Sequence, residues 1–185
     1  MINFVCYIIS IFLFSFSSTE TVYIQPLGNV QDKHVQVVQK AIKSVYGYQC
    51  VVLPAVPHNK KLYANSGTRY DANKILEQFD SDKHILVITE KDIAHYKSSR
   101  FPEWGIFGLG SLTNKTCVVS THRLGPADQI SKRLAKVAVH EVGHTLGLTH
   151  CTKTVNCVMQ DAKGSIKTID KATAQLCNDC KTKMK

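Results

Sequence analysis

The sequence predicts a mixed α/β fold in which helices pack against a β-sheet. Short runs of β-branched residues alternate along the chain with longer segments whose apolar residues recur at helical spacing. The 185 residues are enough for one domain with an ordinary hydrophobic core. No internal repeat or low-complexity linker divides the chain. We therefore expect one compact α/β sandwich with a mixed sheet.

The N-terminal segment differs in composition from the rest. Residues 2–18 carry no charge, and residues 4–16 are almost continuously apolar. The run is too short for a comfortable transmembrane helix and ends in Ser15-Phe16-Ser17-Ser18, which is typical of signal cleavage. We expect residues 1–18 to be a secretory signal, with a secreted or periplasmic domain at 19–185 and no stable membrane insertion after cleavage. An uncleaved anchor and a buried strand are the alternatives.

The first half of the domain is expected to contain three strands and two helices. The first strand should end before Pro26, and the first helix should stop at Gly47, since proline and glycine interrupt regular structure. A loop rich in proline, asparagine and glycine should span residues 55–68. The expected strands are 21–25, 48–53 and 84–89, and the expected helices are 32–46 and 70–79.

The second half leads to a long helix. Residues 90–103 look irregular, the glycine-spaced segment 105–110 should be extended, and residues 115–121 should form another strand. Gly125-Pro126 then opens a helix with proline near its first turn. Gly147 should end this helix, because glycine readily adopts the positive φ of a sharp turn.

His140, Glu141, His144 and His150 form the pattern with the most chemical content. His140 and His144 are four residues apart and so share one face of the helix, where both can reach one zinc ion. The turn at Gly147 would bring His150 back as a third ligand. Glu141 then lies beside the metal, in the place of a general base. This pattern predicts a catalytic zinc site with one position left for water.

The alternative to a zinc site is that the pattern occurs by chance. Two histidines at this spacing, with the glutamate between them, can occur on a solvated helix without any metal. The longer pattern that includes Gly147 and His150 is a much tighter constraint. The other histidines, by contrast, show no ligand spacing and are expected at the surface or in packing positions: His34, His58, His84, His95 and His122.

The segment from His140 to His150 matches the H-E-x-x-H-x-x-G-x-x-H signature of the metzincin metalloproteases. With its cysteines, the chain resembles the archaemetzincin branch of that group. Similar segments upstream are 23–28, 69–70, 105–110 and 118–124. The resemblance implies a compact metzincin-like domain, with Met159 in an apolar turn below the metal and residues 107–111 as an edge strand that binds peptide.

The cysteines allow two interpretations. Cys177 and Cys180 have the spacing of a zinc knuckle, and Cys151 with Cys157 would complete a tetrahedral site. The resemblance favours this structural zinc, which would staple the C-terminal tail. Two disulfides are the alternative in an exported protein. Five residues separate Cys151 from Cys157, one more than is typical of that family.

Cys50 and Cys117 lie in apolar, strand-like runs and are expected to be small buried residues. They could pair if their strands were adjacent.

The sequence therefore predicts a peptidase with a peptide or protein substrate and two zinc ions per chain, one catalytic and one structural. The rival interpretation is a catalytically silent zinc-bearing binding protein, although Glu141 would then have no purpose. The net charge of +9 raises the possibility of nucleic-acid binding. Yet the lysines are spread along the chain without a nucleic-acid motif, so we expect no nucleic-acid partner.

Overall fold

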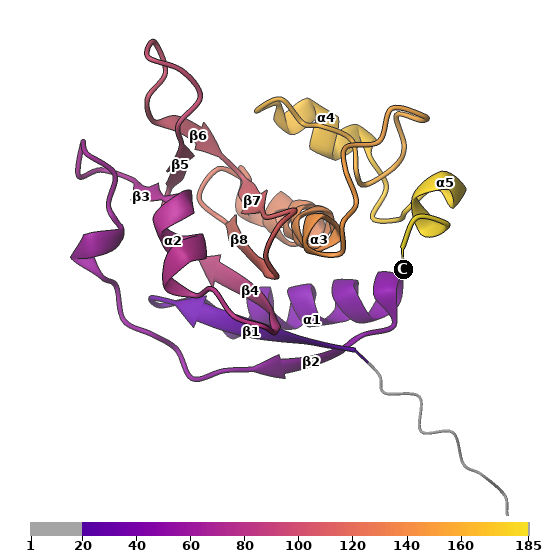
Figure 1. Cartoon of the computed structure of the whole chain (residues 1–185), viewed down its shortest axis with the longest axis horizontal. Coiled ribbons are helices and arrows are strands. Elements are labelled where there is room, and N and C mark those ends of the chain that lie inside the picture. The colour runs from indigo at the N-terminus through magenta and orange to yellow at the C-terminus, as the bar shows by residue number, and fades with distance from the viewer. Residues whose placement is uncertain (1–19, 185) are drawn as a thin grey trace, which may run out of the picture.

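The computed structural model describes residues 20–184, so the predicted signal segment lies outside the described residues. A five-stranded sheet runs through the centre in the order β2-β1-β4-β8-β7 (Figure 1). The first four strands are parallel, and β7 is antiparallel to β8. The bounds are β1 Thr21–Leu27, β2 Gln49–Val52, β4 His84–Thr89, β7 Gly108–Gly110 and β8 Thr116–Ser120.

Helices cover both faces of this sheet. Helices α1 (Asp32–Tyr46) and α3 (Ala127–Thr145) share one hydrophobic core with the sheet, which includes Ile24, Leu86 and Leu134. Helix α2 (Ala72–Gln78) and the short 3₁₀ helix η1 (Lys60–Leu62) pack on the opposite face, around the fully buried Tyr70. The strands are buried on both faces, which explains why they read as continuous apolar runs.

A second, small sheet forms one side of the molecule. It contains β3 (Tyr70–Asp71), β5 (Ile93–His95) and β6 (Trp104–Ile106). The loop that joins β5 to β6 projects beyond the rest of the domain (Figure 1). Just before β5, the Asp92 carboxylate accepts hydrogen bonds from Arg69 and Arg123 at 2.6–2.8 Å.

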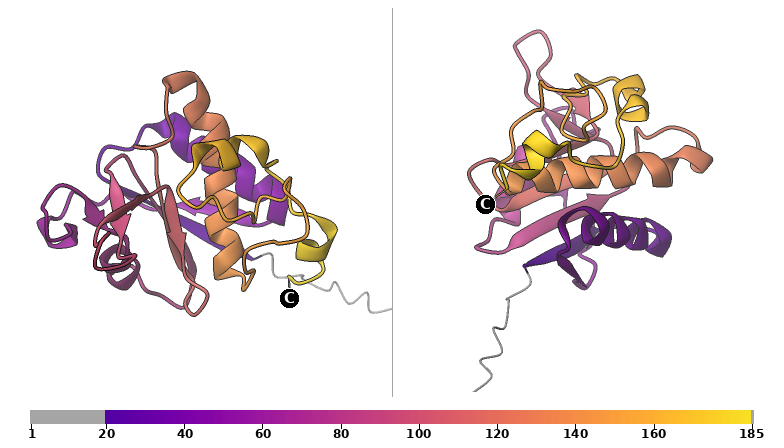
Figure 2. Two further views of the ribbon diagram at one scale, coloured as in Figure 1. Left: turned by 90° about the horizontal axis from the view of Figure 1, so that it is seen from above. Right: turned by 90° about the vertical axis from the view of Figure 1, so that its right-hand side faces the viewer.

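The chain after α3 forms a tail that lies over this helix (Figure 2). Its helices are short: α4 spans Ile166–Lys171 and α5 spans Asn178–Lys181. The tail has its own small core, in which Val158, Met159 and Leu176 pack with Val139 of α3 and Ala41 of α1. Arg133 of α3 also forms an ion pair with Asp170 at 2.7 Å.

The predicted mixed sheet with packed helices is confirmed, and the bounds or assignment of several segments differ from the prediction. β1 continues through Pro26 to Leu27, because β4 pairs with it along this length. The segment predicted as helix 70–79 begins as strand β3, and the segment predicted as irregular contains β5. These two strands pair with each other, a non-local contact that local periodicity does not reveal. The segment 105–110 is divided between β6 and β7.

Cys50 lies on β2 and Cys117 on β8, with β1 and β4 between them. Their strands are therefore not adjacent, and both side chains are free thiols. Within residues 20–184, no helix has the length and apolar character needed to cross a membrane.

Candidate active site

The last turns of α3 carry two of the predicted histidines in a fixed orientation. The Nδ1–H of His140 donates to the carbonyl of Val158 at 2.8 Å, and that of His144 donates to the carbonyl of Leu148 at 2.7 Å. These bonds direct both Nε2 atoms to the same point, where they lie 3.1 Å apart. Burial lowers the pKa of His140 to about 4, and the neighbouring His144 adds a smaller effect in the same direction, so the His140 imidazole stays neutral.

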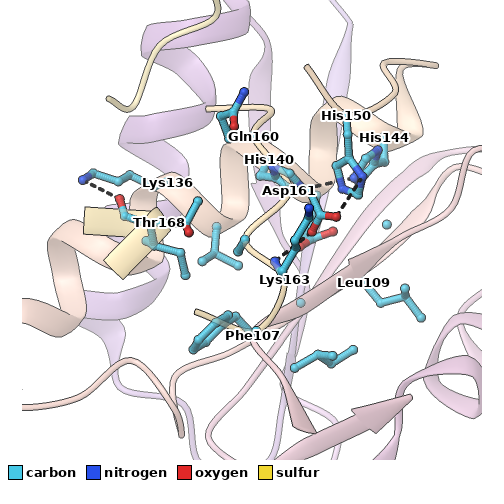
Figure 3. Close-up of a pocket in the computed structure, with 18 of the residues that line it drawn as sticks. Phe107, Leu109, Lys136, His140, His144, His150, Gln160, Asp161, Lys163 and Thr168 are labelled. Atoms are coloured by element: carbon cyan, nitrogen blue, oxygen red, sulfur yellow. Dashed lines mark hydrogen bonds and ion pairs between the residues drawn. The ribbon is translucent and has the colours of Figure 1, made fainter. Parts of the chain in front are cut away.

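His150 reaches this point from outside the helix. α3 ends at Thr145, and Gly147 has a φ of 83°, a value that L side chains rarely adopt. The turn brings the His150 ring centroid to 5.3 Å from that of His140 and 4.9 Å from that of His144. Each of the three rings offers one nitrogen atom to a metal, and these three nitrogen atoms lie within 4.8 Å of one another. His150 is more exposed than the other two, and its Nδ1 lies 3.9 Å from the Asp161 carboxylate (Figure 3).

The three histidines fit a zinc ion. Two nitrogens bound to one zinc at about 2.0–2.1 Å in tetrahedral geometry lie about 3.4 Å apart, close to the spacing of His140 and His144. Neutral imidazoles whose Nδ1–H groups bond backbone carbonyls are typical zinc ligands, since this contact fixes the tautomer. Three protein ligands leave one coordination position open, as in catalytic sites.

Glu141 lies under strand β7 and beside this histidine cluster. Its side chain is buried, and burial raises its pKa to about 8, although a hydrogen bond from the Gly110 backbone opposes the rise. A Cβ atom at Gly108 would lie 2.6 Å from Cγ of Glu141, and one at Gly110 would lie 2.4 Å from the carbonyl oxygen of Glu141. Only glycine at these two positions lets β7 pack this closely on α3.

The histidine cluster opens into a cleft of about 650 Å³. β7 lines one side and α3 the floor, while the tail from Thr149 to Ala172 lines the other side (Figure 3). Three lysines line this cleft, Lys97, Lys136 and Lys163, and its acidic residues are Glu141 and Asp161.

The four predicted cysteines of the tail also come together. Their sulfur atoms all lie within 4.8 Å of one another, and the pairs Cys151–Cys177 and Cys157–Cys180 are 3.7 Å apart. Thiolates on one zinc at about 2.3 Å lie about 3.8 Å apart, so this spacing fits a tetrahedral site. The six cysteines among residues 20–184 are free thiols. The segment between Cys151 and Cys157, one residue longer than is typical of the family, still lets the four sulfur atoms come together.

Cys151 has the acidity expected of a metal ligand. Burial raises its pKa, but hydrogen bonds from the Lys153 and Thr154 backbones outweigh burial and bring the pKa to about 7. Met159 follows Cys157 by two residues and is fully buried. Its sulfur packs on α3 at Gly143, beneath the histidines. The role of Met159 in an apolar turn below the metal stays a prediction of the resemblance.

Sequence reasoning missed the roles of five residues that contribute to the site. The spacing of Gly108 and Gly110 was visible in the sequence, but their close contact with Glu141 of α3 was not. Asp161 and Lys163 gave no recognisable signal, because only the fold of the tail brings them to the cleft. His95, predicted at the surface or in packing, also lines the cleft.

The sequence profile of peptidase family M54 matches residues 32–185. The archaemetzincin of Archaeoglobus fulgidus is 34% identical over 166 residues, which cover 89% of this chain and 98% of that protein. The archaemetzincin of Methanocaldococcus jannaschii is 31% identical over 170 residues, which cover 87% and 90%.

Solved structures are similar to the whole described fold. The crystal structure of the A. fulgidus archaemetzincin, complexed with malonate, has a TM-score of 0.77 at 32% identity and covers 88% of this chain and 98% of that chain. A zinc-dependent peptidase from Methanocorpusculum labreanum has a TM-score of 0.72 at 17% identity, with 89% and 100% covered, which shows the likeness of fold alone.

Proposed function

The chain belongs to peptidase family M54, the archaemetzincins, and on this premise we propose that Glu141 is its catalytic base beside a zinc ion held by His140, His144 and His150. As a member of this family the protein is a zinc metallopeptidase, and its substrates are peptides. The assignment of roles rests above all on one observation: three imidazole rings converge on one point next to the buried side chain of Glu141.

A zinc ion held by His140, His144 and His150 would supply a Lewis acid that polarises the substrate carbonyl and acidifies water. Glu141 accepts the proton of the attacking water and passes it to the departing amine. Burial raises the pKa of Glu141, which makes the carboxylate a stronger base than an exposed one. The close packing of Gly108 and Gly110 on Glu141 limits the positions that this side chain can take.

Strand β7 is the proposed binding strand for the peptide backbone. It is the last strand of the central sheet and lines the cleft through Phe107, Gly108, Leu109 and Gly110. An extended peptide that adds to this edge forms main-chain hydrogen bonds and runs past Glu141. Main-chain binding positions the scissile bond, so any preference for particular side chains must come from other parts of the cleft.

The four cysteines are the proposed ligands of a second, structural zinc. All four ligand positions are filled by protein, which is typical of sites that stabilise structure and do no chemistry. Because Cys151 directly follows His150, a metal held here also fixes the chain next to the third histidine.

Replacing Glu141 with glutamine tests the catalytic assignment. The variant keeps the size and polarity of the side chain but cannot accept the proton. We expect turnover to fall by about 10²–10⁴-fold, the usual share of a general base, with zinc content and melting temperature nearly unchanged. Elemental analysis and digestion of a peptide library measure both quantities. Loss of zinc would make Glu141 a structural residue, and unchanged turnover would refute the assignment.

The apolar segment 2–18 supports a proposal that the protein is exported and that residues 1–18 are removed. Mature protein from its host should then begin near Ser18 or Thr19. Intact-mass spectrometry measures this directly. Soluble protein that still begins at Met1 or Ile2 would refute cleavage.

A further inference from the structure

One end of the cleft is closed by an aromatic side chain that joins its two walls. Trp104 comes from β6, and the tail packs against it at Gly164, where a Cβ atom would lie 3.1 Å from Cζ2 of the indole. Lys97, from the projecting β5–β6 loop, holds its ammonium 4.0 Å from the centre of the Trp104 rings. Lys163 is the chain neighbour of Gly164. Each wall of the cleft thus carries one lysine near the contact between Trp104 and Gly164.

Lys163 is held in an unusual backbone conformation. Its φ is 49°, and among the described residues other than glycine it alone has a positive φ. The turn is closed by the Lys163 backbone N–H, which donates to Oδ1 of Asp161 at 2.8 Å. The other oxygen of Asp161 faces His150 (Figure 3). A backbone in this region costs stability unless its surroundings hold it, and such residues cluster at functional sites.

The charges at this end of the cleft are not balanced by the protein. Within residues 20–184, neither the Lys97 nor the Lys163 ammonium forms an ion pair. Of the acidic side chains that line the cleft, Glu141 is buried under β7 and Asp161 faces His150. Lys136 differs from the other two lysines, because its ammonium is taken up by the carbonyls of Ile169 and Asp170 at 2.9 and 3.1 Å.

From this arrangement we propose that the Lys97–Trp104–Lys163 end of the cleft binds a carboxylate of the peptide substrate. The inference rests on the proposed function, in which the peptide lies along β7. Two exposed lysines on opposite walls attract an anion, and the indole that lines this end of the cleft shields it from water on one side. The carboxylate is either that of an aspartate or glutamate side chain or the C-terminal carboxylate of the peptide.

The chain provides its own probe for this binding. Trp104 is the single tryptophan of the sequence, so intrinsic tryptophan fluorescence reports on this end of the cleft alone. Titrations with the zinc-loaded Glu141→Gln variant measure peptide binding without turnover. The peptides are neutral, C-terminally amidated octapeptides that carry one glutamate at successive positions, each with a matched glutamine peptide. A neutral peptide with a free C-terminus, compared with its amide, tests the other source of the carboxylate.

We expect one glutamate position, or the free C-terminus, to bind about 3–10-fold more tightly than its neutral twin, since exposed ion pairs contribute modestly. The preference should shrink at high salt. Lys97→Glu and Lys163→Asp should each abolish or invert it; aspartate, like asparagine, tolerates the positive φ at position 163. Lys163→Asn should reduce it. Lys83→Glu is the matched control, because Lys83 also lies over a ring, that of Tyr23, but away from the cleft.

Equal binding of all charged and neutral twins would overturn the proposal, and so would a preference that survives both charge reversals. These results are separate from a failure of the proposed function. Cleavage that persists in Glu141→Gln would refute the base assignment, whereas the fluorescence titrations would still measure the charge preference.

Discussion

The histidine cluster and the cysteine cluster differ in how the rest of the molecule holds them. His140 and His144 lie on a 19-residue helix that packs on the central sheet, and backbone carbonyls orient both rings. The cysteines lie in a tail whose helices have six and four residues. Such short helices are not stable by themselves. The core therefore positions most of the catalytic site, whereas the cysteine cluster must help to hold the tail that contains it.

His150 belongs to the boundary between these two regions. It follows the turn that ends α3 and precedes Cys151, the first sulfur ligand of the tail cluster. Its nearest polar partner is Asp161, also from the tail, at 3.9 Å. The comparison thus implies that two of the three proposed zinc ligands are fixed by the core and the third by the tail.

Removal of one thiolate is expected to have the largest effect on this comparison. Cys177→Ser should lower zinc from two ions per chain to one, because structural zinc binding is coupled to the folding of its site. The tail after residue 151 should become sensitive to proteases while the sheet and α3 stay folded. Turnover should fall as well, since His150 loses its support. Elemental analysis, limited proteolysis and cleavage assays measure these three outcomes.

Cys50→Ser is the matched control for that experiment, because Cys50 is a free, half-buried thiol on β2 outside both clusters. It should leave the zinc content and the protease resistance unchanged. A Cys177→Ser protein that retains two zinc ions, or that unfolds throughout, would contradict the division into core and tail.

A smaller effect is expected from crowding Glu141 without touching any metal ligand. In Gly108→Ala the new Cβ atom would lie 2.6 Å from Cγ of Glu141, so β7 or the carboxylate must move. Overpacking of this kind costs about 1–3 kcal/mol, and displacement of the base should lower kcat/KM by about 10–100-fold. Both zinc ions should remain bound, as elemental analysis would show.

Gly67→Ala provides the comparison for this variant. A Cβ atom at Gly67 meets no atom within 4 Å, and the substitution is strained only by the φ of 70°. It should lower the melting temperature slightly and leave kcat/KM unchanged. If Gly108→Ala lost zinc or kept full activity, the close packing of β7 on α3 would not be what positions the base.

The smallest effect should come from the Asp92 ion pairs, which lie in the core region and not in the tail. Burial raises the pKa of Asp92, but the hydrogen bonds from Arg123 and Arg69 outweigh it and lower the pKa below its ordinary value. The Asp92 carboxylate therefore stabilises the folded protein at pH values above the pKa of aspartate in the unfolded chain, about 4. This stabilisation is lost as the pH falls through the lower pKa that Asp92 has in the folded protein.

Asp92→Asn should destabilise the protein by about 1 kcal/mol near neutral pH, a modest value because both arginines are one-third exposed. The difference from wild type should shrink as the pH approaches 3. Denaturant unfolding at several pH values measures this trend. Zinc content at neutral pH should be the same in both proteins, and a difference that stays constant with pH would contradict the role of the ion pairs.

The sequence alone determined a large part of this protein. The order of strands and helices, the turn at Gly147 and the grouping of His140, His144 and His150 followed from local spacing. Local spacing was sufficient because a helix brings residues four apart onto one face, and a glycine turn returns the next segment to it. The tail cysteines were also grouped correctly, although the resemblance to a known family was needed to choose between zinc and disulfides.

Only the tertiary structure decided which distant segments complete the site. β7 lies over Glu141 because β7 pairs with β8, and that pairing places Gly108 and Gly110 against α3. Trp104, Lys97 and Lys163 meet at one end of the cleft because the second sheet and the tail approach each other there. These contacts join residues far apart in the chain and have no periodic signature, so they depend on packing that no local pattern specifies.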